Sequence, residues 1–165
     1  MDVQQLFEEH YEVLYRYLVK LTGDGDAAAD AAQEAFVRLV EHNPRGTQIR
    51  AWLYRVATNV VRDESRVRRR RVELLRESPD RAPVGDDPVT PDRMFELAEK
   101  RRLVRGALDA LNERERTVLL MREEGFSHQE IAEAVGTTTK SVGSMIARAL
   151  QKLTAELGQR TEIQE

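Results

Sequence analysis

The sequence predicts an all-α protein made of two small helical domains joined by a flexible linker. Apolar residues recur at three- and four-residue steps through most of the chain, which is the spacing of one helix face. Aromatic residues make up only 5% of the 165 residues, so the core must consist mainly of Leu, Val, Ile and Ala, which suits helices. Four of the five prolines lie between positions 79 and 91, between the two periodic segments.

The first domain, residues 1–74, is expected to contain three helices. The first ends at Gly23-Asp24-Gly25, the second runs from about Asp26 to His42, and the third starts near Ile49. The expected inward residues of the first helix are Leu6, Phe7, His10, Tyr11, Leu14, Tyr17, Leu18 and Leu21. Those of the second are Ala28, Ala32, Ala35, Phe36 and Leu39, and those of the third are Trp52, Leu53, Val56, Ala57, Val60 and Val61.

A polar, proline-rich linker is predicted over residues 75–91, followed by a second helical domain over 92–158 and a tail over 159–165. Thr90-Pro91 resembles an N-cap followed by proline at the first helical position. That helix continues through Leu97, Val104, Leu108 and Leu111. Asn112 with Glu115, and Ser127 with Glu130, have the spacing of capping boxes that open two further helices. Thr139 is expected to cap a last helix that ends near Leu157.

The strongest local pattern is a helix-turn-helix over residues 129–145. Ile131 and Val135 point inward from its first helix, Ala132 allows a close helix crossing, and Gly136 suits a turn that needs positive φ. Val142 and Ile146 are expected to dock the second helix, whose N-terminal end would enter a DNA groove. The candidate DNA contacts there are Thr138, Thr139, Lys140, Ser141, Ser144 and Arg148. The alternative is a plain helical hairpin with a solvated polar face.

The net charge of −3 conceals two basic segments in an acidic chain, residues 49–72 and residues 137–153, and the second contains Lys140, Arg148 and Lys152 and no acid. Residues 1–48 contain nine acids and four bases, whereas residues 49–72 contain eight arginines, Asp63 and Glu64. An ordered helix rich in arginine is a good phosphate track, although a run of like charges is commonly a solvated face. Asn59 lies among the apolar positions of this helix, and it is equally suited to hydrogen-bonding a base edge or to packing.

Enzymatic chemistry is not expected. The chain has no cysteine, and its three histidines lack ligand spacing, so we expect neither a metal site nor a cofactor. Asp30, Gln33 and Glu34 share one side of the second helix, with Arg38 following Glu34 at i+4. No histidine, second acid pair or phosphate loop accompanies them, which favours a docking surface for another protein or a solvent-exposed face over a catalytic pair.

Together these segments resemble the extracytoplasmic-function (ECF) type of sigma factor of the sigma-70 family. The matching residues are 30–36 (DAAQEAF), 52–63 (WLYRVATNVVRD), 111–116 (LNERER) and 125–132 (GFSHQEIA). The resemblance implies a transcription initiation factor that binds core RNA polymerase at the β′ clamp helices and the β flap. It would recognise the −10 and −35 promoter elements and aid melting, and an anti-sigma factor is an expected partner.

The resemblance also assigns residues. The surface for the clamp helices would comprise Asp30, Gln33, Glu34, Phe36 and Arg38, and the contacts to the −10 element would be Arg55, Asn59, Arg62, Arg66 and Arg69. The loop over residues 43–48 would engage the melted strand, the helix-turn-helix would read the −35 element, and the linker would thread toward the RNA exit path. Many relatives have basic residues where this chain has Gly143 and Met145, which puts upstream readout in doubt.

The main rival interpretation is a stand-alone helix-turn-helix regulator, and a second is an interaction protein that borrows the fold. The first needs a sensor domain, for which residues 1–74 show no pattern, and the arginine run argues against the second. No segment approaches the length of a membrane span and the N-terminus is acidic, so we expect a cytoplasmic protein without membrane insertion or a small-molecule substrate.

Overall fold

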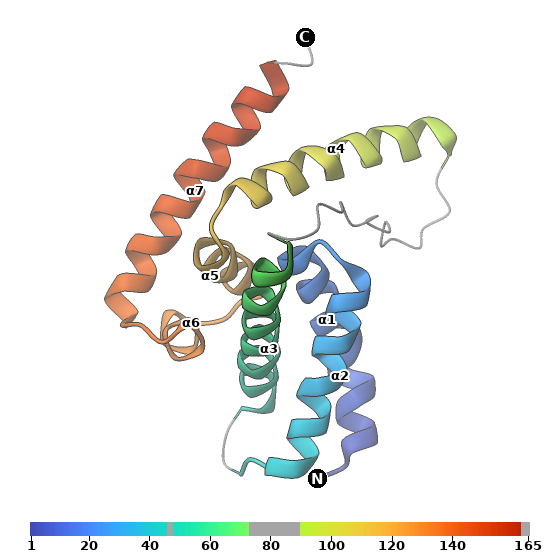
Figure 1. Ribbon diagram of the computed structural model, residues 1–165, viewed down its shortest axis with the longest axis vertical. Helices are drawn as coiled ribbons and strands as arrows, with labels where there is room; N and C mark the ends of the chain where they lie inside the picture. The colour runs from blue at the N-terminus through green and yellow to red at the C-terminus, as the bar shows by residue number, and fades with distance from the viewer. Residues whose placement is uncertain (46–47, 73–89, 163–165) are drawn as a thin grey trace. The chain divides into compact units, whose positions relative to one another are not determined.

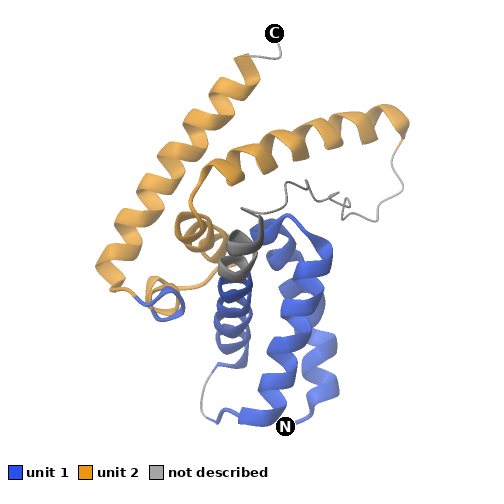
Figure 2. Ribbon diagram, viewed as in Figure 1, with its two compact units in different colours: residues 1–84, 133–136 blue, residues 85–132, 137–165 orange. Residues whose placement is uncertain are grey.

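The computed structural model describes residues 1–45, 48–72 and 90–162, and the side chains of residues 65–72 are not described. The described residues form seven α-helices and no strand, which confirms the all-α prediction. They divide into two compact units, residues 1–84 with 133–136 and residues 85–132 with 137–165 (Figure 2). None of the described helices is long and apolar enough to span a membrane, and no group of described side chains could hold a metal ion.

The first unit contains a three-helix bundle of α1 (Val3–Thr22), α2 (Gly25–His42) and α3 (Ile49–Val72), in which each helix packs against the other two (Figure 1). Gly23 closes α1 in the left-handed conformation (φ +72°), which glycine adopts without steric cost. The Asp24 side chain then caps α2 by accepting from the backbone N–H groups of Asp26 and Ala27. This cap makes α2 begin one residue earlier than predicted.

The bundle core is built largely from the predicted helix faces, with Ala27 and Ala31 of α2 buried as well. The Phe7 side chain, expected inside, is 42% exposed. Tyr54 and Thr58 are buried although neither was predicted to point inward. Both side chains contact Tyr17 of α1. The Tyr17 ring lies 4.8 Å from the Tyr54 ring, and the Tyr17 hydroxyl lies 2.9 Å from Thr58 Oγ1. These contacts connect α1 to α3 through the centre of the bundle.

The second unit contains α4 (Pro91–Ala110), α5 (Glu113–Glu123), the first part of α6 (His128–Val135) and α7 (Thr139–Glu162), while residues 133–135 of α6 are grouped with the first unit. Helix α7 packs against α4 and α5. Thr90 and Pro91 occupy the predicted N-cap and first helical positions of α4. Val104, which lies within the predicted helix, is 46% exposed. Helix α7 continues to Glu162, past the predicted end near Leu157.

The expected linker over residues 75–91 lies outside the described residues except for Thr90 and Pro91.

Candidate functional site

The outer surface of α2 presents the predicted polar face of Asp30, Gln33 and Glu34. Asp30 and Gln33 are exposed, while the Glu34 carboxylate accepts a hydrogen bond of 2.8 Å from Arg38 Nε at i+4. Both members of that ion pair are less than half exposed. The opposite side of α2 is a row of buried alanines, which brings the helix close to its neighbours and holds the polar face outward. The arrangement is a rigid surface with fixed charges.

Phe36 differs from the other members of this predicted set because it is only 6% exposed. Its ring lies 5.1 Å from that of Phe7 and 6.2 Å from that of Tyr11, so it packs between α1 and α2. Phe36 therefore supports the α2 surface from inside instead of forming part of it. This burial confirms the inward position expected from the helix spacing, whereas the resemblance to the family assigns Phe36 to the docking surface.

Two exposed valines extend the polar face of α2 and were not singled out from the sequence. Val37 and Val40 are 51% and 54% exposed, and they follow Gln33 at i+4 and i+7, which places them on the same side of the helix. Their i+4 and i+7 spacing from Gln33 is the sequence signal that could have identified them. The α2 surface thus combines acidic, amide and apolar groups.

Helix α3 presents a row of polar side chains along its outer side. Arg55, Asn59 and Arg62 follow one another at i, i+4 and i+7, and all three are partly exposed. On the opposite side of the same helical turns, Leu53 and Ala57 are buried in the bundle core. This packing holds the helix that carries the row. Two cations flanking an amide suit a nucleic-acid strand, because arginine attracts phosphate and an amide can pair with a base edge. The side chains of Arg66 and Arg69 lie outside the described residues.

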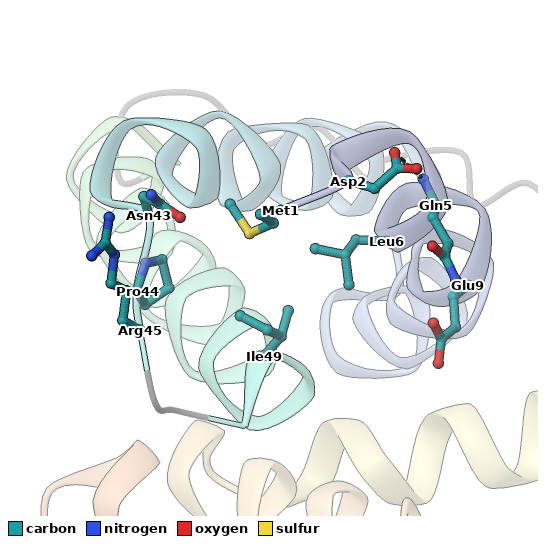
Figure 3. Close-up of a pocket in the computed structure, with 9 residues that line it drawn as sticks. All are labelled: Met1, Asp2, Gln5, Leu6, Glu9, Asn43, Pro44, Arg45 and Ile49. Carbon is teal, nitrogen blue, oxygen red and sulfur yellow. Dashed lines mark hydrogen bonds between the residues drawn. The ribbon is translucent and has the colours of Figure 1, made fainter.

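The loop between α2 and α3 borders a pocket of about 600 Å³ at one end of the bundle (Figure 3). Asn43 ends α2 in the left-handed conformation (φ +41°) and turns the chain toward α3. The Met1, Leu6 and Ile49 side chains point toward the centre of the pocket in Figure 3. Its other lining residues are Asp2, Gln5, Glu9, Asn43, Pro44 and Arg45. Residues 46 and 47, at the tip of the predicted strand-binding loop, lie outside the described residues.

The helix-turn-helix is formed by α6 and the N-terminal half of α7. Ser127 and Glu130 make the predicted capping box, with Glu130 N–H donating to Ser127 Oγ and Ser127 N–H donating to Glu130 Oε1, each at 3.1 Å. Gly136 has φ +72° as predicted, and Thr137 N–H donates to the Ala132 carbonyl, which completes a Schellman turn. Gly125 closes α5 in the same manner with φ +89°, a role that the sequence reasoning missed.

The N-terminal end of α7 differs from the prediction in its cap. Thr138, not Thr139, is the capping residue: its Oγ1 accepts from Ser141 N–H at 3.2 Å and donates to Ser141 Oγ at 2.9 Å. The hydroxyls of these two residues are therefore engaged with each other. Thr139, Lys140, Ser144 and Arg148 are exposed on the helix surface and remain the predicted candidates with accessible side chains.

Met145 lies on the buried side of α7, together with Val142, Ile146 and Ala149. A basic residue at this position would be buried, so the lack of one does not remove a DNA contact from this protein. Gly143 is partly exposed, and a Cβ atom placed on it would meet nothing closer than His128 Cε1 at 4.0 Å. The structure shows no steric need for glycine there. The prediction of weaker readout of the −35 element therefore rests on Gly143 alone.

The segment 111–116 (LNERER) makes hydrogen bonds that connect α4, α5 and α7 of the second unit. Arg116 donates to the carbonyls of Leu108 and Leu111 at 2.9 and 3.0 Å, which caps the C-terminal end of α4. The capping box of Asn112 and Glu115 forms as predicted, and Glu115 Oε1 also accepts from Lys152 Nζ of α7 at 2.7 Å. Burial raises the pKa of Glu115, but the hydrogen bonds from Lys152 and the Asn112 backbone, with the charges of Lys152 and Arg148, outweigh it and leave that pKa below its ordinary value.

Comparison with known proteins finds two family models that match this chain. The model of sigma-70 region 2 matches residues 6–71, and that of sigma-70 region 4 matches residues 101–153. The ECF RNA polymerase sigma factor SigL of Mycobacterium tuberculosis is 33% identical over 164 residues, which cover 94% of this chain and 90% of SigL. SigE of Mycolicibacterium smegmatis is 33% identical over 154 residues, and this chain spans only 59% of its length.

Two solved structures share the fold over 95% of this chain. The sigma factor RpoE of Bartonella quintana, in complex with the anti-sigma factor NepR, aligns with a TM-score of 0.74 at 21% identity and is covered over 97% of its length. CnrH, in complex with the cytosolic domain of CnrY, aligns with a TM-score of 0.67 at 25% identity and is covered over 88%.

Proposed function

The chain belongs to the ECF sigma factors of RNA polymerase, and we propose that three surfaces of its two units divide the work of promoter recognition. It is a promoter-directing transcription initiation factor whose partners are core RNA polymerase, promoter DNA and an anti-sigma factor. The rival interpretation as a stand-alone helix-turn-helix regulator is not favoured, because the region 2 match covers the whole first bundle. We assign it a cytoplasmic location and no catalytic chemistry of its own.

The first proposed surface is the outer side of α2, which docks on the clamp helices of β′. Asp30, Gln33 and the Glu34–Arg38 pair supply the polar contacts, and exposed Val37 and Val40 supply apolar area beside them. Charged pairs at such surfaces contribute orientation and association rate, whereas desolvated apolar groups contribute affinity. Phe36 acts indirectly, by holding α2 against α1.

The second proposed surface is the row of Arg55, Asn59 and Arg62 on α3, which engages the −10 element as it melts. Arginines bind the phosphates of either strand, and the Asn59 amide lies between them at the right spacing to meet an unstacked base. Arg66 and Arg69 would extend this row. One observation supports this proposal above the others: a single bundle presents a docking face on α2 and this row on α3, so binding polymerase also positions the DNA contacts.

The third proposed surface is the N-terminal end of α7, which reads the −35 element. Thr139, Lys140, Ser144 and Arg148 are exposed there. Thr138 and Ser141 cap the helix by bonding to each other, and the positive N-terminal end of the helix favours phosphate. We assign −10 recognition to residues 1–74 and −35 recognition to residues 92–158. Each contact alone is weak, and polymerase raises their effective concentration by holding both domains at the promoter spacing.

Run-off transcription with purified core polymerase on genomic promoter fragments tests the proposed function. We expect discrete transcripts only when the protein is added, and DNA binding by the free protein that is weak by comparison. The Asn59→Ala/Arg62→Ala variant should bind core polymerase normally and lose activity on duplex promoters, with partial recovery on a template whose −10 region is already unpaired. Absence of core binding by the wild-type protein would refute the assignment as a whole.

A further inference from the structure

Helix α4 is buried near one end only. Its buried residues are Ala107 and Leu108, and none of the residues before them in this helix is buried. The hydrogen bonds from Arg116 to the carbonyls of Leu108 and Leu111 hold the same end. A helix that is anchored at one end can change its angle to the helix beside it, unless a further contact fixes that angle.

Gly106 is the place where α7 makes such a contact with α4. A Cβ atom on Gly106 would lie 2.5 Å from Nη1 and 2.7 Å from Cζ of Arg160, which belongs to the last turns of α7. Atoms that are not bonded to each other do not approach so closely, so the guanidinium group of Arg160 occupies the space that a side chain at position 106 would need. Glycine is unfavourable inside a helix relative to alanine, and this close approach gives a reason for it here.

The guanidinium group of Arg160 is only weakly held in this position. Its Nε atom is buried and has no hydrogen-bond partner among the described residues. Arg160 forms an ion pair with Glu156, one turn earlier, but the distance of 3.7 Å between Nε and Glu156 Oε2 is too long for a hydrogen bond. Solvent screens this attraction, because the two side chains are 40% and 33% exposed. A buried N–H group without a partner opposes the contact, so the favourable and unfavourable effects are close to balance.

We propose that Arg160 and Gly106 form a clasp that fixes the angle between α4 and α7, and that this clasp opens while the rest of the second unit stays folded. Because the opposing effects are close to balance, little free energy separates the closed state from the open one. Helix α4 is the first helix of the second unit, so the clasp sets the direction in which the chain enters that unit. The proposal concerns contacts between α4 and α7 alone and does not depend on which promoter surface is correct.

The chain has no cysteine, so two introduced cysteines can be labelled selectively to follow this angle. Spin labels at Arg93→Cys on α4 and Gln151→Cys on α7, both exposed positions, report the distance between the helices by pulsed electron paramagnetic resonance of the full-length protein. We expect one main distance in this labelled protein, and a broader distribution or a second distance when Arg160→Ala is added. Gln159→Ala, which changes an exposed neighbour of Arg160, should leave the distribution unchanged.

Two glycines provide a matched comparison by hydrogen exchange, because only one of them lies under the clasp. Gly106→Ala should speed exchange of the α7 amides between residues 154 and 160 by about threefold or more, since its Cβ displaces the guanidinium group. Gly158→Ala, whose Cβ would meet nothing within 4 Å, should slow exchange of the same amides, because alanine is the better helix former. In an Arg160→Ala background, Gly106→Ala should no longer speed their exchange.

Exchange of the α5 amides separates local opening of the clasp from loss of the whole fold. Gly106→Ala and Arg160→Ala should leave the α5 amides within about twofold of their original exchange rates, because the opening does not reach that helix. Three results would overturn the proposal: an unchanged distance distribution in Arg160→Ala, exchange shifts of the same sign in Gly106→Ala and Gly158→Ala, or a loss of α5 protection together with that of the last turns of α7.

Discussion

The hydroxyl of Tyr17 on α1 and Oγ1 of Thr58 on α3 share a hydrogen bond of 2.9 Å in the buried centre of the first bundle. Both residues are about 1% exposed or less. Because a buried hydroxyl without a partner loses its hydration and gains nothing, the pair makes the packing of α1 on α3 specific as well as stable. That packing determines where the row of Arg55, Asn59 and Arg62 lies relative to the docking face of α2.

Removing both partners of this bond should therefore cost less than the sum of the costs of removing each one alone. We expect Tyr17→Phe to lower the free energy of unfolding of the bundle by about 1–2 kcal/mol. Tyr17→Phe/Thr58→Val should cost less than the sum of the two single changes. Trp52, the single tryptophan of the chain, is buried in this bundle, so its fluorescence during urea unfolding reports this unit. Additive losses would show that the bond contributes no coupling.

Charge reversal on α2 should separate docking from folding. Asp30→Lys/Glu34→Lys is expected to weaken binding to core polymerase by more than about tenfold, or 1.4 kcal/mol, because it reverses two charges on one rigid face. Glu8→Lys/Glu12→Lys is the matched control: it has the same i, i+4 spacing on α1, and Glu12 pairs with Arg16 as Glu34 pairs with Arg38. Wild-type core binding by the α2 variant would contradict the docking assignment.

Adjacent residues of α7 should respond oppositely to a new arginine. Ser144 is exposed and Met145 is 8% exposed. Ser144→Arg should raise affinity for duplex DNA with a stability change within about 0.5 kcal/mol. Met145→Arg should cost about 3 kcal/mol or more, since it buries an unpaired charge. Thermal unfolding followed by circular dichroism and a salt titration of DNA binding check both. A stable Met145→Arg variant with enhanced DNA binding would contradict the inward placement of Met145.

Two glycines near the recognition helix should differ in sign when changed to alanine. Gly143→Ala is expected to stabilise α7 by about 1 kcal/mol, because alanine is the better helix former and its Cβ meets no close atom. Gly136→Ala is expected to destabilise the unit by about 1–2 kcal/mol, because φ is +72° there. Hydrogen exchange of α6 and α7 amides in the full-length protein gives the local effect. If the two changes shift stability in the same direction, the backbone account is wrong.

The Glu115–Lys152 pair should make the second unit sensitive to acid. The pKa of Glu115 is lowered, so the stability that it contributes is complete above the ordinary carboxyl pKa and is lost as pH falls through the lowered value. Lys152→Met should cost about 0.5–1 kcal/mol near neutral pH, because Lys152 is 53% exposed and screened by solvent. That difference should shrink below about pH 4. In a Glu115→Gln background, Lys152→Met should have no such pH-dependent effect.

The local chemistry of the chain was sufficient to predict its helices and most of their ends. Caps, turn glycines and three- and four-residue spacing act over one or two turns. Thr90-Pro91, the two capping boxes and Gly136 were therefore recognisable from neighbouring residues alone. The charge contrast between the first two helices and the arginine-rich third was also a property of composition.

Tertiary structure decided which members of a predicted face meet solvent. Met145 is buried, and Phe7 is exposed although it lies on the predicted inward face. Burial depends on where a neighbouring helix ends and crosses, and the spacing of residues along one helix carries no information about that. Tyr17 and Thr58 are forty-one positions apart, and Glu115 and Lys152 thirty-seven, so neither pair has a local signature.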